Sequence, residues 1–357
     1  MRAVARGRPH SVSDDLSALE GWLQDRLPDR PGLRLAHGGA PASGFSAETT
    51  ILDATWEGGA GKLVLRKETP DPPVYPTQVP GLTTEVEIQY RVMEALQGAV
   101  PLAPLHGYEA DPSVLGGEFF VMGFVDGQVP VENPMYTLEG WFLDLRPEQR
   151  TAMIEDGVRR LAAVHAVDWP RAGFLLPEGA HPTTRRQLDL WHDYMVRELE
   201  GREHPLYDRA FAWLTAHLPE ETEPVLNWGD PRLGNIIWRD DRAACLTDFE
   251  AASIAPAEVD LGWWLMFDRW CHETYGAPRH EGEISRDAQR ALYEEVSGRT
   301  VGDTTWYEVF AAARYTAIVV RVMNRLVVRG LMPADQTVWL ENPATVCLQQ
   351  MIEEFGL

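Results

Sequence analysis

Two polar residues in the C-terminal half have the types and spacing of a site for a divalent cation. Asn235 is followed by four strand-like residues, Asp240 and Asp241 have turn character, and Asp248 ends the returning strand. Because a hairpin of equal arms brings its open ends together, we expect Asn235 and Asp248 on neighbouring strands, roughly 5 Å apart at the backbone. One amide oxygen and one carboxylate at this separation suit Mg²⁺, which binds few protein oxygens together with phosphates.

A third candidate, Asp230, lies five residues before Asn235 in a loop that contains Gly229, Pro231 and Gly234. A carboxylate held beside a metal–phosphate site can orient an alcohol and accept its proton. Positioning and charge neutralisation are most of what phosphoryl transfer requires of a protein. Aspartate also caps turns and ends strands for structural reasons alone. Three such residues around one short hairpin favour the catalytic interpretation.

Two regions of different pattern must position these residues, and we place their boundary near Asp126 and Gly127. The first predicted domain, 1–126, combines β-rich runs with two helices and indicates an antiparallel sheet. The second, 127–357, is mostly amphipathic helix with the hairpin as a short interruption. The fold class is therefore α+β. The strands are predicted at 48–56, 62–69, 100–110 and 117–127, and the helices at 13–27, 83–97, 147–167, 183–201, 206–218 and 306–328.

The segments WGDPRLGN (228–235) and DFE (248–250) resemble the catalytic segment of aminoglycoside phosphotransferases, choline kinases and their relatives. The resemblance implies a bilobal, protein-kinase-like fold and transfer of a γ-phosphoryl group from ATP or GTP to an alcohol. It also implies Asp230 as catalytic base and Asn235 and Asp248 as Mg²⁺ ligands. Trp228 replaces the usual histidine. Since an indole N–H donates but cannot accept, we expect it to pack and support the loop.

Two further residues have structural roles implied by the same resemblance. Asp260, in EVDLGWW, is expected to hydrogen-bond the catalytic loop. His165 ends a helix of similar pattern and is expected to be packed and hydrogen-bonded.

The nucleotide-binding residues follow from the resemblance in the first domain. KLVLRKE is similar to the strand that carries the phosphate-pairing cation, and by register that cation is Arg66, which can hold phosphate oxygens with two N–H bonds. Glu85 or Glu87 is its candidate partner. A solvated charged helix face explains the two glutamates about equally well, and the alternative for Arg66 is an outward surface charge on the hairpin.

The adenine and phosphate contacts are expected from two more segments. GEFFVMGFVDG is similar to the linker between lobes, with Met122 behind the ring and backbone groups of Gly123 and Val125 at the adenine edge; the alternative is an ordinary buried strand. The loop 38–46 is expected to cover the phosphates through Ser43, Gly44 and Ser46.

Charge and composition limit the partners. The net charge of −22 disfavours nucleic acid and anionic membranes. It suits a small-molecule alcohol, which could be cationic. Glu250, Asp268 or Glu273 could contact its amino group, and these residues could equally be solvated. With no leader or membrane-spanning pattern and three dispersed cysteines, the chain is expected to be cytoplasmic. Two alternatives stay open: a kinase of another metabolite, such as a hydroxyacyl thioester, and a nucleotide-binding pseudokinase.

Overall fold

The computed structural model describes residues 16–39 and 47–357. The chain folds into two compact units. The first comprises Met1–Pro70, Thr84–Tyr90 and Pro104–Phe124, and the second comprises Asp71–Thr83, Arg91–Ala103 and Val125–Leu357. Within the described residues, no helix combines the length and the apolar composition that a membrane crossing requires.

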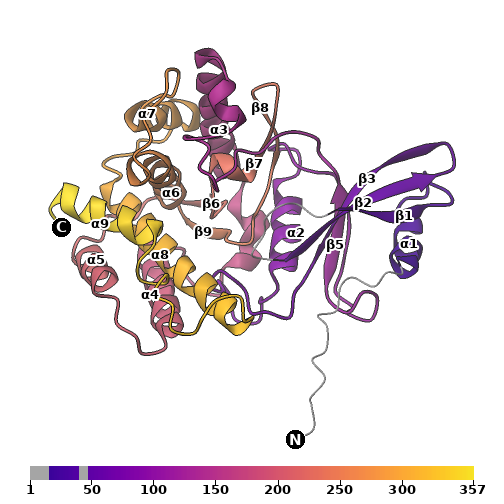
Figure 1. Ribbon diagram of the computed structural model, residues 1–357, viewed down its shortest axis with the longest axis horizontal. Coiled ribbons are helices and arrows are strands. Elements are labelled where there is room, and N and C mark those ends of the chain that lie inside the picture. Colours follow the sequence, from indigo (N-terminus) through magenta and orange to yellow (C-terminus); the bar gives the residue numbers. More distant parts are fainter. Residues whose placement is uncertain (1–15, 40–46) are drawn as a thin grey trace, which may run out of the picture. The chain divides into compact units, whose positions relative to one another are not determined.

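The first unit contains an antiparallel sheet of five described strands in the order β1-β2-β3-β5-β4. Its elements are α1 (Ser17–Gln24), β1 (Arg34–Gly39), β2 (Glu48–Trp56), β3 (Gly59–Lys67), β4 (Leu105–Glu109) and β5 (Phe119–Gly123). The first residues of helix α2 (Glu85–Leu96) also belong to this unit. The predicted N-terminal antiparallel sheet is therefore confirmed (Figure 1).

The core of the first unit lies between the sheet and helix α1. Leu19 and Leu23 of the helix pack with Leu52, Leu65 and Phe119 of the strands, and all five side chains are fully buried. The helix thus presents one apolar stripe to one face of the sheet, which is the usual way such a sheet is covered.

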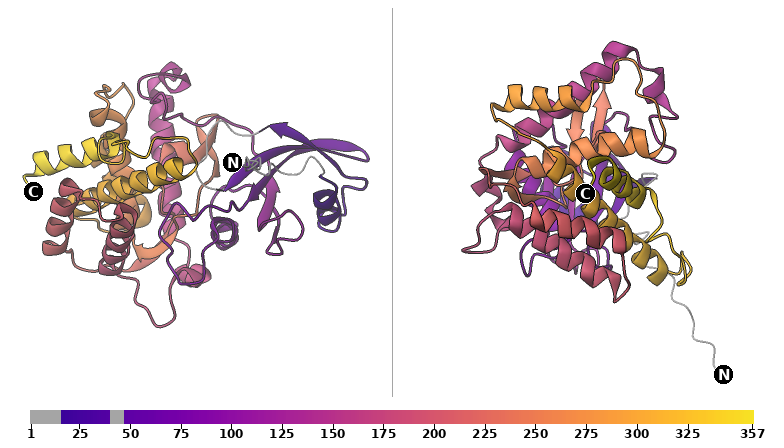
Figure 2. Two further views of the ribbon diagram at one scale, coloured as in Figure 1. Left: turned by 60° about the horizontal axis from the view of Figure 1, so that its bottom comes forward. Right: turned by 90° about the vertical axis from the view of Figure 1, so that its left-hand side faces the viewer.

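The second unit is mostly helical, as predicted. Its helices are α3 (Pro147–His165), α4 (Thr184–Leu199), α5 (Pro205–Ala216), α6 (Glu258–Arg269), α7 (Arg286–Ser297), α8 (Thr305–Val328) and α9 (Pro343–Phe355), with shorter turns η1 (Trp141–Asp144), η2 (Trp169–Leu175), η3 (Leu233–Asn235) and the π-helical η4 (Trp270–Thr274). Helix α8 packs against α4, α5, α6 and α9 (Figure 1). The last helix, α9, also contacts α5 near the C-terminus (Figure 2).

Two small antiparallel sheets interrupt these helices. Strand β6 (Pro224–Asn227) pairs with β9 (Ser253–Pro256), and β7 (Ile236–Arg239) pairs with β8 (Arg242–Leu246). The β7–β8 hairpin turns at Asp240 and Asp241, as predicted, and both residues have a positive φ. Residues 228–235 connect β6 to β7 and 247–252 connect β8 to β9, so both motif segments emerge from these two sheets.

Candidate active site

The loop 228–235, called the catalytic loop below, is held by buried hydrogen bonds at its start. The Asp260 carboxylate accepts from the backbone N–H groups of Trp228 (2.5 Å) and Gly229 (3.0 Å). His165 contacts Asp260 through Nε2 (3.3 Å) and Tyr293 through Nδ1 (2.7 Å). Because a carboxylate only accepts, Nε2 is the donor in the contact with Asp260. The structural roles predicted for Asp260 and His165 are confirmed.

Gly229 is required by the path of the catalytic loop. Its φ is +94°, and a Cβ atom placed there would lie 2.1 Å from the carbonyl oxygen of Ala251. Only glycine enters this backbone region without strain, and no other residue would fit so close to the neighbouring segment. The glycine of the motif thus lets two connecting segments lie against each other.

Trp228 supports the loop as expected. Its side chain is fully buried, its ring packs against Phe249, and its indole Nε1–H donates to the backbone carbonyl of Thr247 at 2.8 Å. It therefore ties the start of the catalytic loop to the residues that precede Asp248.

Asp230 lies buried in the loop with its two carboxylate oxygens in different surroundings. Oδ1 accepts from the indole N–H of Trp263 (2.7 Å) and from Nε of Arg232 (3.0 Å). Oδ2 accepts from the hydroxyl of Tyr75 at 3.3 Å. Burial raises the pKa of Asp230 above its ordinary value, although the Arg232 cation opposes this. A carboxylate with a raised pKa is a stronger general base than an exposed one.

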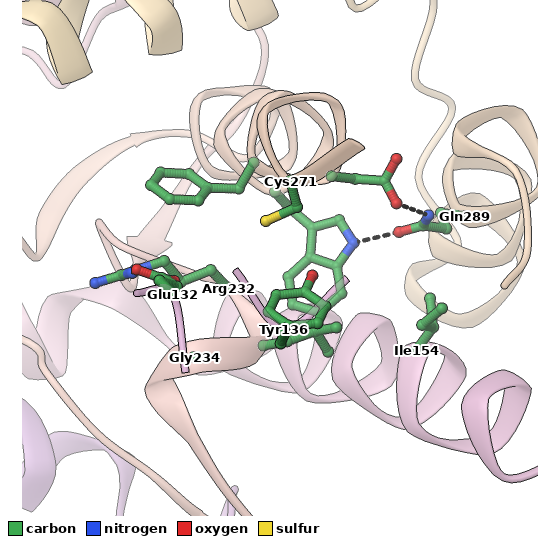
Figure 3. Close-up of a pocket in the computed structure, with 11 residues that line it drawn as sticks. Glu132, Tyr136, Ile154, Arg232, Gly234, Cys271 and Gln289 are labelled. Carbon is green, nitrogen blue, oxygen red and sulfur yellow. Dashed lines mark hydrogen bonds and ion pairs between the residues drawn. The ribbon is translucent and has the colours of Figure 1, made fainter. Parts of the chain in front are cut away.

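Arg232 links Asp230 to a second carboxylate. Its guanidinium contacts Glu132 as well as Asp230 and lies over the ring of Phe267. Burial would lower the pKa of Arg232, but Asp230 and Glu132 raise it above its ordinary value, so the residue is cationic. Figure 3 shows Glu132 and Arg232 next to each other at one side of a small cavity.

The two predicted metal ligands lie at the open end of the β7–β8 hairpin. The backbone N–H and hydroxyl of Thr247 both donate to the carbonyl of Asn235, at 3.0 and 2.9 Å, so the residue before Asp248 is adjacent to Asn235. The Asn235 amide nitrogen donates to the carbonyl of Asp230 at 2.9 Å. That bond directs the amide's donor group into the loop and leaves its oxygen for a cation.

The donor set fits Mg²⁺. One amide oxygen and one carboxylate are few protein ligands, and Mg²⁺ commonly completes its shell with phosphate and water. Among the described residues, no three His, Cys, Asp or Glu side chains form a metal-binding group. Asp248 has a positive φ of 58°, an unusual conformation that non-glycine residues adopt most often as Asn or Asp.

A buried arginine, Arg314 of α8, supports the loop from a distance in sequence. Its Nη2 donates to the carbonyl of Gly229 at 3.0 Å, and its guanidinium carbon lies 4.8 Å from the ring of Trp191 and 4.5 Å from that of Trp263. Burial lowers the pKa of Arg314 to about 10, so it remains charged at neutral pH. Because Trp263 also donates to Asp230, the arginine contacts both the loop and one of the hydrogen-bond donors to Asp230.

The three carboxylates predicted to meet a substrate amino group lie in different environments. Asp268 binds Arg279 (2.5 Å), Gln289 (2.9 Å) and Arg286 (3.3 Å), and its pKa is lowered because Arg279 outweighs burial. Glu273 pairs with the same Arg286 at 2.8 Å. These cation partners within the chain argue against substrate contact for Asp268 and Glu273.

Glu250 lies nearer to Asp230 and Tyr75. It is buried in the segment after Asp248, and its charge acts on Tyr75, the residue that donates to Asp230. Its predicted contact with a substrate amino group stays a prediction.

A small cavity lies beside Asp268 (Figure 3). It has a volume of about 20 Å³ and is lined by residues that include Arg232, Tyr136, Cys271 and Gln289. Such a volume holds about one water molecule. The cavity is therefore too small for an acceptor and is a small internal void next to the catalytic loop.

The predicted nucleotide residues lie in the first unit or at its end. Arg66 is on β3, opposite Phe120 of β5, and Glu85 and Glu87 are in the first turn of α2. Which glutamate pairs with Arg66 stays a prediction.

Met122 and Gly123 end β5, whereas Val125 belongs to the second unit. The Gly123 N–H donates to Pro104 at 2.8 Å, so a contact of Gly123 with adenine would use its carbonyl. Ser43, Gly44 and Ser46 lie outside the described residues.

Several site residues were not found from the sequence: Tyr75, Glu132, Arg232, Trp263 and Arg314. Arg232 carries a signal, because it lies inside the motif two residues after Asp230. Trp263 lies in the EVDLGWW segment that was singled out for Asp260. The other three come from distant segments, and nothing in their local pattern indicates a place at this site.

A comparison with known protein families finds a match that includes the loop 228–235 and the segment 248–250. Residues 39–297 match the model of APH, described as the phosphotransferase enzyme family. Among curated proteins, 306 residues are 24% identical to the probable acyl-CoA dehydrogenase IBR3 of Arabidopsis thaliana, covering 79% of this chain and 35% of that protein. The chain spans between 18% and 35% of the length of the first curated relatives that it matches.

Two solved structures share the fold. One is a Ralstonia eutropha JMP134 protein provisionally assigned as an aminoglycoside phosphotransferase, with a TM-score of 0.70, 24% identity and coverage of 95% of this chain and 98% of that one. The other is the ternary complex of streptomycin, ATP and APH(2″)-IIa, with a TM-score of 0.51, 13% identity and coverage of 94% and 99%. At these identities the likeness shows the kinase-like fold.

Proposed function

The chain belongs to the phosphotransferase enzyme family, and on this premise we propose that it transfers the γ-phosphoryl group of ATP to a hydroxyl group of a small molecule, with Mg²⁺ as cofactor. The observation that carries the proposal is the linkage of Asp230 and Asn235. The carbonyl of the first residue holds the amide of the second, next to the segment that carries Asp248.

Asp230 acts as the base in this proposal. Trp263 and Arg232 fix its Oδ1 atom, so the orientation of Oδ2 is set before the acceptor arrives. The acceptor hydroxyl donates to Oδ2 and loses its proton to that oxygen as the phosphoryl group is transferred. A preset base saves the cost of ordering it during the reaction.

Asn235 and Asp248 would hold Mg²⁺, which supplies positive charge to the phosphate oxygens when bound. The donor role of ATP is supported by the neighbour of the same fold that was solved with ATP and streptomycin. GTP is the alternative donor, because backbone contacts to a base leave little trace in side-chain identity.

The acceptor has two candidate classes. The neighbour that binds streptomycin favours an amino sugar. The curated relatives named as acyl-CoA dehydrogenases favour a hydroxy acid or hydroxyacyl thioester. The arginine partners of Asp268 and Glu273 support the second class, because they offset the negative charge that would attract a cationic substrate.

The test is Asp230→Asn, with Asp240→Asn in the exposed hairpin turn as the matched control. We expect phosphoryl transfer to fall about 10²- to 10⁴-fold in the first variant, since a positioned base contributes that much, and to stay at the wild-type rate in the second. Transfer is measured as ADP release with pooled aminoglycosides, macrolides, choline-like amines and hydroxy acids. ATP binding, measured by calorimetry, should persist in both.

Normal turnover by Asp230→Asn would contradict the role of the base. The pseudokinase alternative would be favoured by a different result. In that case the wild type binds ATP and Mg²⁺ but phosphorylates nothing in the panel, and Asp230→Asn does not change its rate of ADP release.

A further inference from the structure

A proline-rich segment of the second unit, residues 71–83, lies across two helices and is called the strap below. At its start, Asp71 forms an ion pair with Arg325 of α8 at 3.2 Å. Further along, Gln78 accepts a hydrogen bond from Gln187 of α4 at 2.9 Å. The strap is therefore held at two points by polar contacts, although it forms neither helix nor strand.

The backbone between these points is held as well. The carbonyl of Pro73 accepts from Nε of Arg321 at 3.2 Å, and that of Val74 accepts from the hydroxyl of Tyr194. Both accepting carbonyls directly precede Tyr75 in sequence, so the side chain of this tyrosine starts from a fixed backbone.

From this backbone Tyr75 reaches the base. Its hydroxyl donates to Oδ2 of Asp230 at 3.3 Å, while Oδ1 is taken by Trp263 and Arg232. Of these three bonds the one from Tyr75 is the longest. The tyrosine thus places a hydroxyl on the oxygen that the proposed mechanism leaves for the acceptor.

We propose that the Tyr75 hydroxyl occupies the acceptor position on Asp230 and limits ATP hydrolysis by water until a substrate alcohol displaces it. The inference rests on the proposed phosphotransferase function. Water is always present and can accept the phosphoryl group. A preset base that water could reach would therefore promote the hydrolysis of ATP. The Tyr75 hydroxyl, hydrogen-bonded to Oδ2 of Asp230, keeps water from binding to that oxygen.

Two properties suit Tyr75 to this positioning role. Burial raises its pKa well above the ordinary value, with Asp230 and Glu250 adding to the effect, so the phenol stays protonated and remains a donor. The long bond to Oδ2 is weak enough for a better-placed alcohol to replace it.

The test is Tyr75→Phe, assayed with Mg²⁺ and ATP and with water as the acceptor. In that reaction the water oxygen bonds to the γ-phosphorus, the bond from phosphorus to the ADP oxygen breaks, and a water proton passes to Asp230. We expect ADP release to rise about three- to tenfold, the range that corresponds to removing one hydrogen bond. Tyr207→Phe, which removes a hydroxyl bonded to the Trp191 carbonyl, is the matched control and should leave the rate unchanged.

The pH dependence of ATP hydrolysis distinguishes this role of Tyr75 from a general destabilisation of the strap. Loss of the Tyr75 donor removes a bond to the charged form of Asp230, so the acid limb of the hydrolysis profile should move to higher pH in Tyr75→Phe. The gain in hydrolysis should disappear in the double variant with Asp230→Asn.

A second variant, Asp71→Asn, loosens the strap without altering the tyrosine and should raise hydrolysis by a smaller factor. An unchanged or lower rate in both variants, with ATP still bound, overturns the inference. This outcome differs from failure of the proposed function, which the acceptor panel decides: a protein that phosphorylates a panel alcohol but shows no rise in hydrolysis keeps the function and loses the role of Tyr75.

Discussion

At the scale of single residues, the catalytic loop depends on a glycine as much as on its carboxylate. Gly229 has a positive φ and lies against the backbone of Ala251, while its N–H and carbonyl are bound by Asp260 and Arg314. The position of Asp230, the next residue, follows directly from this geometry. The loop is therefore sensitive to any side chain at residue 229.

We predict that Gly229→Ala destabilises the fold much more than Gly298→Ala. Both glycines have a positive φ, but a Cβ atom at Gly298 meets nothing within 4 Å, whereas at Gly229 it would lie 2.1 Å from a carbonyl oxygen. The left-handed conformation alone costs an alanine about 1 kcal/mol, and the clash should add about 2 kcal/mol or more. Chemical denaturation of the two variants measures the difference. Equal losses of stability would show that the loop relaxes without cost.

At the scale of elements, the start of α2 depends on a carboxyl from outside the helix. Glu68, directly after β3, accepts from the backbone N–H of Val86 in the first turn of α2 at 3.1 Å. Burial, with Glu85 and Glu118 nearby, raises the pKa of Glu68 to about 7. The protonated form is therefore favoured in the folded state at acid pH.

This shift predicts a pH dependence of stability. Because the folded pKa of Glu68 is raised above its unfolded value of about 4.5, its stabilising effect is fully present below that value and is lost as pH rises through about 7. Between about pH 5 and pH 8 the wild type should lose about 2 kcal/mol of unfolding free energy through this residue, a figure reduced for its partial exposure.

Urea denaturation of Glu68→Gln and of Glu57→Gln, an exposed carboxyl in the turn between β2 and β3, tests this. The first variant should lack that part of the pH dependence and the second should retain it. A pH dependence identical in all three proteins would rule out the effect of Glu68.

At the scale of the whole molecule, ligand binding and folding are linked. A ligand that binds only the folded state stabilises it by about 2.7 kcal/mol at one hundred times its dissociation constant. The net charge of −22 opposes the binding of a free triphosphate, so accompanying Mg²⁺ should matter for affinity as well as for chemistry.

We therefore predict that ATP with Mg²⁺ raises the melting temperature and that EDTA abolishes most of the rise. Asp248→Asn should reduce the rise, because the amide keeps the shape and tolerates the positive φ of 58° but lacks the charge. Asp240→Asn, in the hairpin turn, should behave like wild type. Differential scanning fluorimetry gives the comparison, and an EDTA-insensitive rise would show that Mg²⁺ is not needed for binding.

The sequence alone determined the parts of this protein that depend on neighbours along the chain. The periodic segments predicted α3, α4, α5 and α8, and the turn residues at Asp240 and Asp241 predicted the hairpin that places Asn235 near Asp248. Such features could be predicted because helix periodicity and hairpin pairing act over a few residues. The polar helix α7 and the C-terminal helix α9 were not predicted.

Only the tertiary structure decided which groups surround Asp230 and which charges are already paired. Tyr75 and Asp230 are 155 residues apart, and Arg314 and Gly229 are 85 apart. Asp268 was a plausible substrate ligand by its charge, but its partners Arg279 and Arg286 come from segments whose approach no local pattern indicates. The physical reason is that the partner of a buried charge is selected by packing across the whole unit, where only desolvation and long-range contacts distinguish one carboxylate from another.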